Sequence, residues 1–398
     1  MAPVAGGPRF MTIMHTVSES SVLLPRTDDE VHSMLLDAIA GHEPIRICGA
    51  DTWRNAGAPI QAHHTLSLRD LSGIIAYVPG DLTITARAGT TMAELRQATA
   101  AHDQWLGLDP AGDRTGTIGA TIATASSGPL AHAFGTPRDL VLGLDAVTGY
   151  GELVRPGGRV VKNVAGFDLV RLFTGSWGTL GAITSVTLRL RATPVHDVTL
   201  AMPAGDAHRL IELIPVLRRN TLSLLACEWL DGTTARELGI SDGEDVVLIR
   251  LGGNDAFVRG QRALLDRITP SQQCDAAIWD AISALDSDAS AVIRMTGSVS
   301  TLVSRLERLR AALDGAGASV AMHASLARGV IRVIVSGEAQ SLREALQPAA
   351  HDPQRIPERL PAAWWAAEHD PFSGGLAGRI RAAFDPGLLC NRRSVANA

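Results

Sequence analysis

Residues 116–129, GTIGATIATASSGP, form a run whose side chains before the final proline are only Gly, Ala, Ser, Thr or Ile. So bare a stretch fits two structures. One is a tight turn followed by a small-residue helix packed in a core. The other is a backbone on which a flat, charged ligand lies, because glycine lets peptide N–H groups approach an anion closely. The run alone leaves both interpretations open.

Two further glycine-rich segments occupy the same half of the chain, RICGADT (46–52) and GGRVVKNVAGFDLVRLFTGSWGTLGAI (157–183). Three such loops favour the second interpretation, because converging amides supply the donors that a diphosphate needs without an arginine clamp. The commonest alternatives are absent. The sequence has no G-x-G-x-x-G after a strand, no G-x-x-x-x-G-K-[ST] phosphate loop and no G-x-S-x-G elbow.

Length and composition limit the kind of protein in which these loops occur. A chain of 398 residues predicts two domains, and 46% hydrophobic residues allow a sizeable core. The net charge of −5 and the lack of a long basic block exclude a nucleic-acid partner held mainly by phosphates. The four cysteines stand far apart, which indicates neither a zinc site, a disulfide framework nor an iron–sulfur ligand set, and is typical of a cytoplasmic protein.

Neither end of the chain nor its interior predicts membrane insertion. The first twenty residues lack the basic start and apolar core of a signal peptide, and we expect them to be disordered. No later segment approaches an apolar run of 18 residues.

Local patterns predict the elements that carry the loops. Thr27 is the expected N-cap of the first helix, with Glu30 three residues on. The expected elements are a helix in 27–44, a strand in 44–49, a hairpin of 73–78 and 82–88 around Pro79-Gly80-Asp81, a helix in 91–103, a strand–turn–strand in 138–154, a short helix in 168–176 and a period-two strand in 180–194. Helices and antiparallel strands in mixed order over 195–380 predict a separate α+β domain.

Several of these stretches resemble a known family. RICGADT, ARAGT, GTIGATIATASSGP, TPRDLVLG, KNVAGFDLVRLFTGSWGTLGAIT and the terminal FDPGLLCN are similar to the FAD-binding domain of the vanillyl-alcohol oxidase (PCMH) superfamily. Within it, the chain most resembles the FAD-binding subunits of bacterial glycolate oxidase, the GlcE type. The similarity covers about 25–195 strongly, the last twenty residues moderately and 195–375 weakly.

The resemblance implies an α+β fold in four parts. After residues 1–20, a PCMH-type FAD-binding domain of two α+β subdomains would occupy 21–194. An α+β cap domain with an antiparallel sheet would follow in 195–375, and 376–398 would return to the FAD domain.

The resemblance also implies non-covalent FAD and a set of contacts. No histidine stands in the first loop for a covalent link, and Cys48 is expected to be a buried thiol in a strand. The implied cofactor-binding residues are Gly49, Ala50, Asp51 and Thr52 on the diphosphate; Thr117, Gly119, Ala120, Thr124 and Gly128 along the diphosphate and flavin; Thr136, Arg138 and Asp139 near the isoalloxazine; Gly178, Thr179, Gly181 and Ile183 at the ribityl or adenine portion; and Gly89 and Asn391.

The chain departs from the family pattern at four places. Ala120 stands where a second glycine is usual, and Phe167 replaces a frequent tyrosine. Trp177 occupies a position that is often acidic in the sister subunit. Asn391 is followed by two arginines rather than by Pro-Gly, so the last flavin contact is in doubt.

Oxidation of a 2-hydroxy acid by a flavin needs a base for the hydroxyl proton and a cation for the carboxylate. The candidates are His323 and His369 as the base and Arg328 as the anchor, although each is also typical of a surface or core side chain. The related dehydrogenases carry a Gly-His-x-Gly-Asp-Gly-Asn-type motif that this sequence lacks. We therefore expect this chain alone to hold an incomplete active site.

The resemblance implies a subunit of a complex that oxidises glycolate to glyoxylate. Its partners would be a sister FAD-linked subunit and an iron–sulfur subunit that receives the electrons. The complex would be cytoplasmic or peripheral at the inner face of the membrane. Two alternatives stay open: a self-sufficient FAD-dependent oxidoreductase of another alcohol or 2-hydroxy acid, and a non-catalytic subunit that has lost its flavin.

Overall fold

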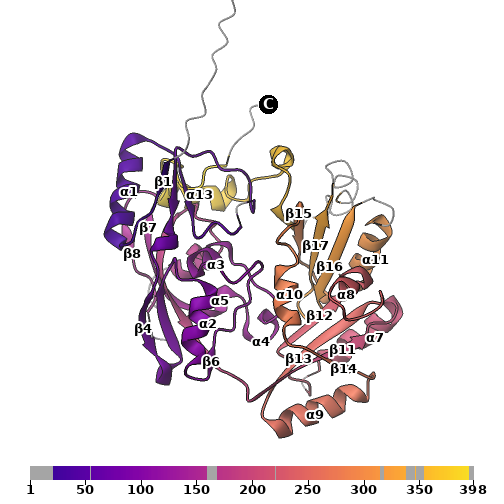
Figure 1. The fold of residues 1–398 in the computed structure, drawn as a ribbon. Helices are drawn as coiled ribbons and strands as arrows, with labels where there is room; N and C mark the ends of the chain where they lie inside the picture. The colour runs from indigo at the N-terminus through magenta and orange to yellow at the C-terminus, as the bar shows by residue number, and fades with distance from the viewer. Residues whose placement is uncertain are drawn as a thin grey trace, which may run out of the picture.

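The computed structural model describes residues 21–53, 55–158, 168–219, 221–313, 318–337, 346 and 354–393. The expectations for residues 1–20 and for Phe167 lie outside this part. Figure 1 shows two lobes and a C-terminal segment that passes from the second lobe back to the first.

The first lobe opens with a small three-stranded parallel sheet in the order β1 (Ser21–Leu23), β3 (His64–Ser67), β2 (Ile45–Cys48). Helix α1 (Asp28–Gly41) packs on it through Val31, Leu35 and Ala38. The Thr27 hydroxyl accepts from the Glu30 amide, which confirms the predicted N-cap. The left-handed residue that ends α1 is His42, at φ 52°, and Gly41 is its last helical residue.

A five-stranded antiparallel sheet completes the first lobe. Its order is β4 (Ile74–Val78), β5 (Thr83–Arg87), β9 (Gly181–Arg189), β7 (Val141–Thr148), β8 (Leu153–Val154). The helices of this part are α2 (Met92–Ala100), α3 (Ile118–Thr124), α4 (Ala131–Phe134), α5 (Pro137–Leu140) and α6 (Leu169–Phe173). The predicted hairpin and the helices in 91–103 and 168–176 are confirmed.

The strand expected in 180–194 is present as β9, and one expectation in this sheet is wrong. Residues 138–140 belong to the helical turn α5 rather than to a strand, because Thr136 and Asp139 form a capping box around it. Strand β9 does not alternate between buried and exposed residues, since all of it except Arg189 is buried. As the central strand it is covered on both faces, so the period-two pattern does not mark a solvent face.

The second lobe is a single antiparallel sheet, as predicted. Its eight strands run in the order β14 (Gln272–Cys274), β11 (His196–Pro203), β13 (Val246–Gly253), β12 (Ala226–Leu230), β16 (Ser319–Ser325), β17 (Val330–Ser336), β15 (Ala291–Met295), β18 (Arg355–Arg359). Its helices are α7 (Ala207–Leu217), α8 (Gly232–Glu237), α9 (Asp255–Asp266), α10 (Ile278–Ala284) and α11 (Leu302–Leu313).

Alternation along β13 explains how both faces of this sheet are covered. Val247 and Ile249 face the core that α7, α9 and α11 share. Val246 and Leu248 face the opposite cluster, with α8 and α10. Successive strand residues point to opposite faces, so one hydrophobic strand serves two cores.

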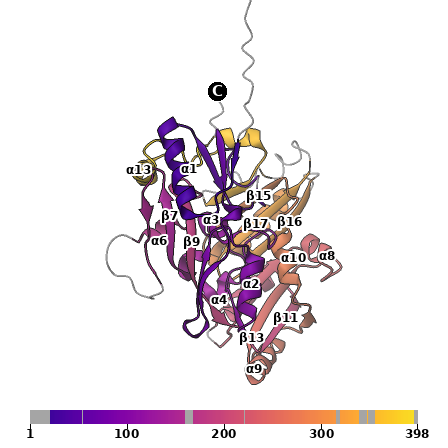
Figure 2. The same cartoon turned by 60° about the vertical axis from the view of Figure 1, so that its left-hand side comes forward.

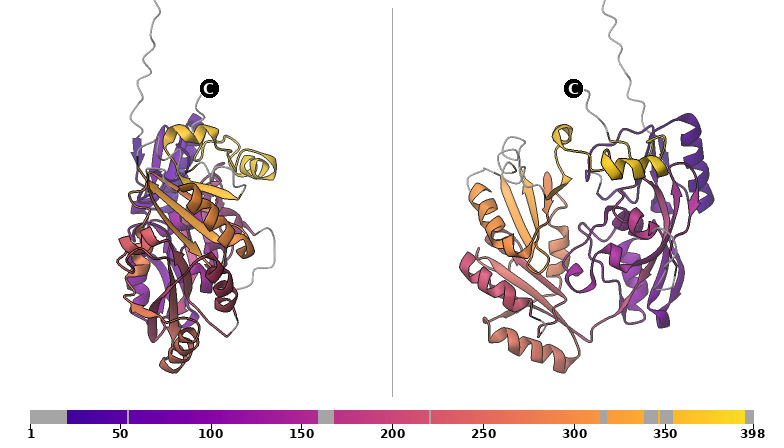
Figure 3. Two further views of the ribbon diagram at one scale, coloured as in Figure 1. Left: turned by 90° about the vertical axis from the view of Figure 1, so that its right-hand side faces the viewer. Right: turned by 180° about the vertical axis from the view of Figure 1, so that it is seen from behind.

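The C-terminal segment joins the two lobes (Figures 2 and 3). Helix α13 (Gly375–Phe384) returns to the first lobe, where Phe384 meets Phe173 edge to face at 5.7 Å. Beyond it the chain runs parallel to β2: the Ile45 amide donates to Leu389 and the Asn391 amide donates to Ile45. In the described part of the chain, no helix has the length and apolar character needed to cross a bilayer.

Candidate cofactor site

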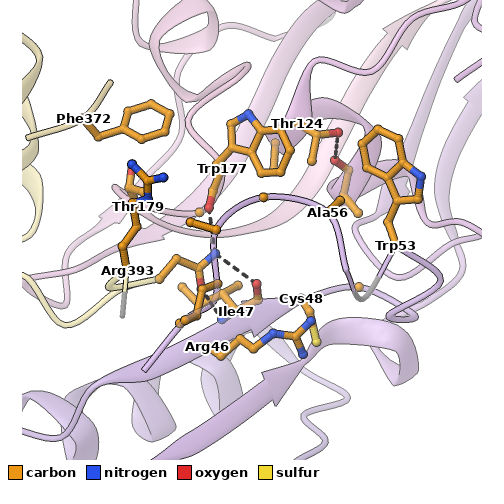
Figure 4. Close-up of a pocket in the computed structure, with 18 of the residues that line it drawn as sticks. Arg46, Ile47, Cys48, Trp53, Ala56, Thr124, Trp177, Thr179, Phe372 and Arg393 are labelled. Atoms are coloured by element: carbon orange, nitrogen blue, oxygen red, sulfur yellow. Dashed lines mark hydrogen bonds between the residues drawn. The ribbon is translucent and has the colours of Figure 1, made fainter. Parts of the chain in front are cut away.

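A pocket of about 670 Å³ lies where the glycine-rich loops of the first lobe meet β18 and the C-terminal segment (Figure 4). Most of the residues implied by the family resemblance line it. They are Gly49, Ala50, Asp51, Thr52, Thr117, Gly119, Ala120, Thr124, Gly178, Thr179, Gly181, Ile183 and Asn391. The structure thus brings together loops that are far apart in the sequence.

The first two loops approach each other so closely that side chains would interfere. A Cβ at Gly49 would overlap the Thr117 hydroxyl. That hydroxyl is buried, lines the pocket and has no hydrogen-bond partner among the described residues. Leaving a buried donor unpaired is costly, so the site offers a hydroxyl to a ligand.

The bare run therefore has both of the structures that the sequence left open. Ile118 and Ile122 of α3 enter the core, one turn apart. Gly119 packs on the Ala88 backbone, where its amide donates at 2.8 Å and where a Cβ would lie 2.6 Å from the Ala88 Cβ. The opposite face of α3 presents Ala120 and Thr124 to the pocket.

The third loop is held to the first by Asn391. Its side-chain oxygen accepts from the Ile47 amide at 2.7 Å, and its Nδ2 donates to the carbonyls of Ile47 and Trp177 at 3.2 and 2.7 Å. Gly178 adopts φ 69°, and a Cβ there would lie 2.5 Å from Nδ2. Asn391 lines the pocket, but its polar atoms already bind these two loops.

Among the described residues, three arginines line the pocket, and the sequence analysis named none of them as cofactor-binding. Arg46 pairs with Asp51, and Arg355 binds both oxygens of Glu368 at 2.8 Å. Burial lowers the pKa of Arg46, but Asp51 and Cys48 together outweigh it, so the pKa is raised. Arg46 lies in the first glycine-rich segment, Arg355 begins β18 and Arg393 lies in the C-terminal segment, so no shared motif marks the three.

The arginine that departs from the family ending is one of the three. Arg393 pairs with Asp370 at 3.5 Å and lies over the Trp365 ring at 5.4 Å. Its backbone bridges to Ile60. The Arg392-Arg393 ending therefore contributes to the pocket wall instead of removing the C-terminal segment from it.

Aromatic rings form flat parts of the wall. Trp53 and Trp177 lie nearly parallel, with centroids 6.5 Å apart and an interplanar angle of 17°. Trp365 and Phe372 line the other side of the opening. The sequence signals for these walls were Trp53 directly after the first glycine-rich segment and Trp177 within the third, and the sequence analysis noted only Trp177.

Some implied residues lie outside the pocket lining and support the loops instead. A Cβ at Gly89 or Gly128 would overlap a neighbouring backbone carbonyl. Thr136 and Asp139 cap α5, and Arg138 donates to the Thr174 carbonyl at 3.3 Å. Cys48 ends β2 as expected, but it is half-buried and lines the pocket, so the prediction of a buried thiol is wrong.

The catalytic candidates divide between two places. His369 lines the pocket. His323 and Arg328 are absent from its lining and stand on β16 and in the turn after it. His323 is buried and its Nδ1 lies 3.1 Å from Glu228 Oε2.

The pocket residues fit FAD. A dinucleotide needs flat apolar walls for its rings, and amides, hydroxyls or cations for its diphosphate. The described lining supplies both, with Trp53 and Trp177 as walls and the unpartnered Thr117 hydroxyl and the loop backbones as donors.

Comparison with known proteins agrees with this geometry. Residues 20–157 match the FAD binding domain family. Glycolate oxidase subunit GlcE of Escherichia coli K12 is 34% identical over 233 residues, which cover 57% of this chain and 61% of that protein. Glycolate oxidase subunit GlcD of Bacillus subtilis is 32% identical over 181 residues, covering 45% of this chain and 38% of that protein. The alignments span less than two thirds of either relative.

Among solved structures, p-cresol methylhydroxylase with substrate bound has a TM-score of 0.74 at 14% identity, covering 94% of this chain and 88% of that chain. This similarity shows the fold and confirms the predicted PCMH-type α+β architecture. Residues 20–157 thus match an FAD binding domain, and FAD is the cofactor that the pocket fits.

Proposed function

We propose that the chain is the FAD-binding subunit of a complex that oxidises a small 2-hydroxy acid, of the glycolate oxidase type. The pocket formed by the three glycine-rich loops is the main support for this proposal, because it combines donors for a diphosphate with flat walls for rings. The names of the two relatives, both subunits of glycolate oxidase, support the substrate class and the presence of a sister subunit.

The division of labour within the chain follows from the pocket. Bound FAD supplies a hydride acceptor. The amides of the first loop and the Thr117 hydroxyl bind its diphosphate, while Asn391 holds the first and third loops at the spacing that they need. The reduced cofactor would pass its electrons to an iron–sulfur partner, because the four cysteines of this chain stand too far apart in the sequence to suggest a cluster site.

The decisive experiment is spectroscopic. The purified chain should show the absorbance of an oxidised flavin and should take up FAD after its removal. With the sister subunit present and oxygen excluded, glycolate should bleach the flavin, whereas acetate, which has no hydroxyl group, should not. A colourless protein that takes up no FAD would overturn the proposal.

A second candidate is a self-sufficient oxidoreductase. The observation that favours it is the buried His323–Glu228 pair, with Arg328 nearby, because these residues lie within this chain. Turnover of a 2-hydroxy acid by the isolated chain with an artificial dye as acceptor would favour this candidate. Bleaching only in the presence of the sister subunit would favour the first.

A further inference from the structure

A second polar cluster lies where the two lobes meet. Glu228 stands on β12 and His323 on the neighbouring strand β16, while Arg328 is in the turn that follows β16. Helix α4 of the first lobe contacts β12, and Figure 1 shows it between the two lobes. His132 stands on α4, where burial lowers its pKa and the charges of Glu228 and Arg328 also act on it.

His323 has one ring nitrogen paired and one unpaired. It is 7% exposed, and its Nδ1 lies 3.1 Å from Glu228 Oε2, a carboxylate that is itself 2% exposed. A carboxylate can only accept here, so Nδ1–H donates to Glu228, and in the neutral tautomer this leaves Nε2 as an acceptor. Nε2 is buried and has no partner among the described residues. A buried nitrogen without a hydrogen-bond partner destabilises the folded chain unless a ligand donates a hydrogen bond to it.

Arg328 is a cation without a close carboxylate. It is half-buried, and no ion pair of its guanidinium occurs within the described ranges. Burial lowers its pKa, and Arg294 adds to that effect, while the carboxylates of Glu228, Asp109 and Asp139 oppose it. The field of these acids keeps the guanidinium charged without saturating its donors, so it is suited to a small anion.

The cluster is continuous with the cofactor pocket. Helix α3 lines the pocket, and the chain after it leads through residues 125–130 into α4. Asp109 fixes this connection, because its two carboxylate oxygens accept from the amides of Gly128 and Leu130 at 3.2 and 2.8 Å. One rigid segment therefore runs from the cofactor loops to the cluster.

We propose that Arg328 and His323 form the binding site for a 2-hydroxy carboxylate, with the carboxylate on the Arg328 guanidinium and the hydroxyl donating to His323 Nε2. Glu228 is the positioning residue that holds the ring in the required tautomer. This inference rests on the proposed function, since it assigns the substrate end of the same enzyme. It places that end at the boundary of the lobes, outside the lining of the nucleotide pocket.

The test uses the full chain with FAD bound and a ligand that cannot be oxidised. The probe is 2-hydroxy-2-methylpropanoate, which has the hydroxyl and the carboxylate but no hydrogen on the carbinol carbon; 2-methylpropanoate is its partner without the hydroxyl. Binding is followed by the perturbation of the flavin absorbance and by the rise in melting temperature.

Arg328→Gln should weaken binding of both acids about 10- to 100-fold, because both use the carboxylate. Arg328→Lys should lose less, since it keeps the charge without the forked geometry. His323→Leu should weaken only the hydroxy acid, about 3- to 10-fold, and so abolish the preference between the two ligands. Arg308→Gln, an exposed arginine of α11 in the same lobe, should leave both affinities unchanged.

The outcomes separate this inference from the proposed function. If glycolate bleaches the flavin and Arg328→Gln and His323→Leu still bind both acids like the parent chain, the proposed site is wrong and the function stands. If the parent chain with its partner neither binds the hydroxy acid nor is bleached by glycolate, the function itself is wrong. The flavin spectrum and melting temperature of each variant show whether it is folded and loaded with FAD.

Discussion

At the scale of single residues, the Thr117 hydroxyl and the bare Gly49 opposite it show what the loops are built to accept. The Thr117 hydroxyl occupies the space that a Cβ at position 49 would need, and it lines the pocket without a hydrogen-bond partner among the described residues. Because this hydroxyl lines the pocket, it can donate a hydrogen bond to an anion that binds there.

Replacing this hydroxyl tests that argument. Thr117→Val keeps the shape and removes the donor, so the FAD dissociation constant should rise about 10- to 100-fold, the value of a hydrogen bond to a charged oxygen. Fluorescence titration of the apoprotein with FAD measures it. Thr184→Val is the matched control, because that hydroxyl is also buried and unpartnered but lies outside the pocket lining. Equal affinity in both variants would show that Thr117 does not contact the diphosphate.

Asp109 is a single residue that makes the stability of the fold depend on pH. Burial, reinforced by the Glu228 carboxylate, raises its pKa to about 7, against the lowering effect of the Leu130 and Gly128 amides and Arg250. The folded chain thus holds a proton that the unfolded chain loses near pH ~4. The stability contributed by this proton is fully present below that pH and is lost as the pH rises through 7.

We therefore expect the melting temperature to fall less steeply between about pH 4 and pH 7 in Asp109→Ala than in the parent chain. The variant starts from a lower stability, because the amides of Gly128 and Leu130 lose their acceptor. The comparison is between slopes, so that loss does not affect it. Parallel slopes would mean that Asp109 is ionised throughout this range.

At the scale of elements, the C-terminal segment holds the first and third glycine-rich loops together through Asn391, a contact that we call the clip. Asn391 spans from β2 to the turn before β9, with all of its side-chain bonds going to backbone atoms. The segment itself is fixed by Asp385, whose carboxylate accepts from the amides of Leu389 and Cys390. Loop spacing in the pocket therefore depends on residues at the far end of the chain.

Asn391→Asp tests the clip with a change of one atom. An acidic oxygen would face the carbonyls of Ile47 and Trp177, so the unfolding free energy should drop by about 1–3 kcal/mol and FAD should bind at least about tenfold more weakly. Denaturant unfolding and FAD titration measure these effects. Asn254→Asp is the control, since it caps α9 far from the pocket and aspartate is an equally good cap. Undiminished FAD affinity in Asn391→Asp would refute the clip.

Elements with a local signal could be predicted from the sequence. Pro79-Gly80-Asp81 marked the hairpin of β4 and β5, and Thr27 marked the start of α1. The strand expected at 138–140 failed because the capping box of α5 needs only four residues and leaves no helical period to read. The double coverage of β9 could not be predicted either, because it depends on what packs on each face.

At the scale of the whole molecule, the pocket is shared between distant parts of the chain. Its glycine loops carried a recognisable pattern, but Arg355 on β18 and Arg393 at the C-terminus came with none. Their positions follow from two pairings that only the complete fold creates: the bridge of Ala56 to Arg359 and that of Ile60 to Arg393. The sequence analysis therefore found the glycine-rich loops, which a local pattern marks, and missed the arginines that only the complete fold brings to the pocket.

This sharing predicts how the molecule unfolds. The main hydrophobic clusters of the first lobe are separate from those of the second, so the protein without FAD should melt in two calorimetric transitions. FAD contacts parts of both lobes, because β18 and residues 365–372 line the pocket together with the glycine loops. At a free concentration of one hundred times its dissociation constant, FAD should raise the free energy of unfolding by about 2.7 kcal/mol. The two transitions should then merge at a higher temperature. Differential scanning calorimetry with and without FAD measures this. A shift confined to one transition would mean that the first lobe alone binds the cofactor, and that β18 and the C-terminal segment only border the site.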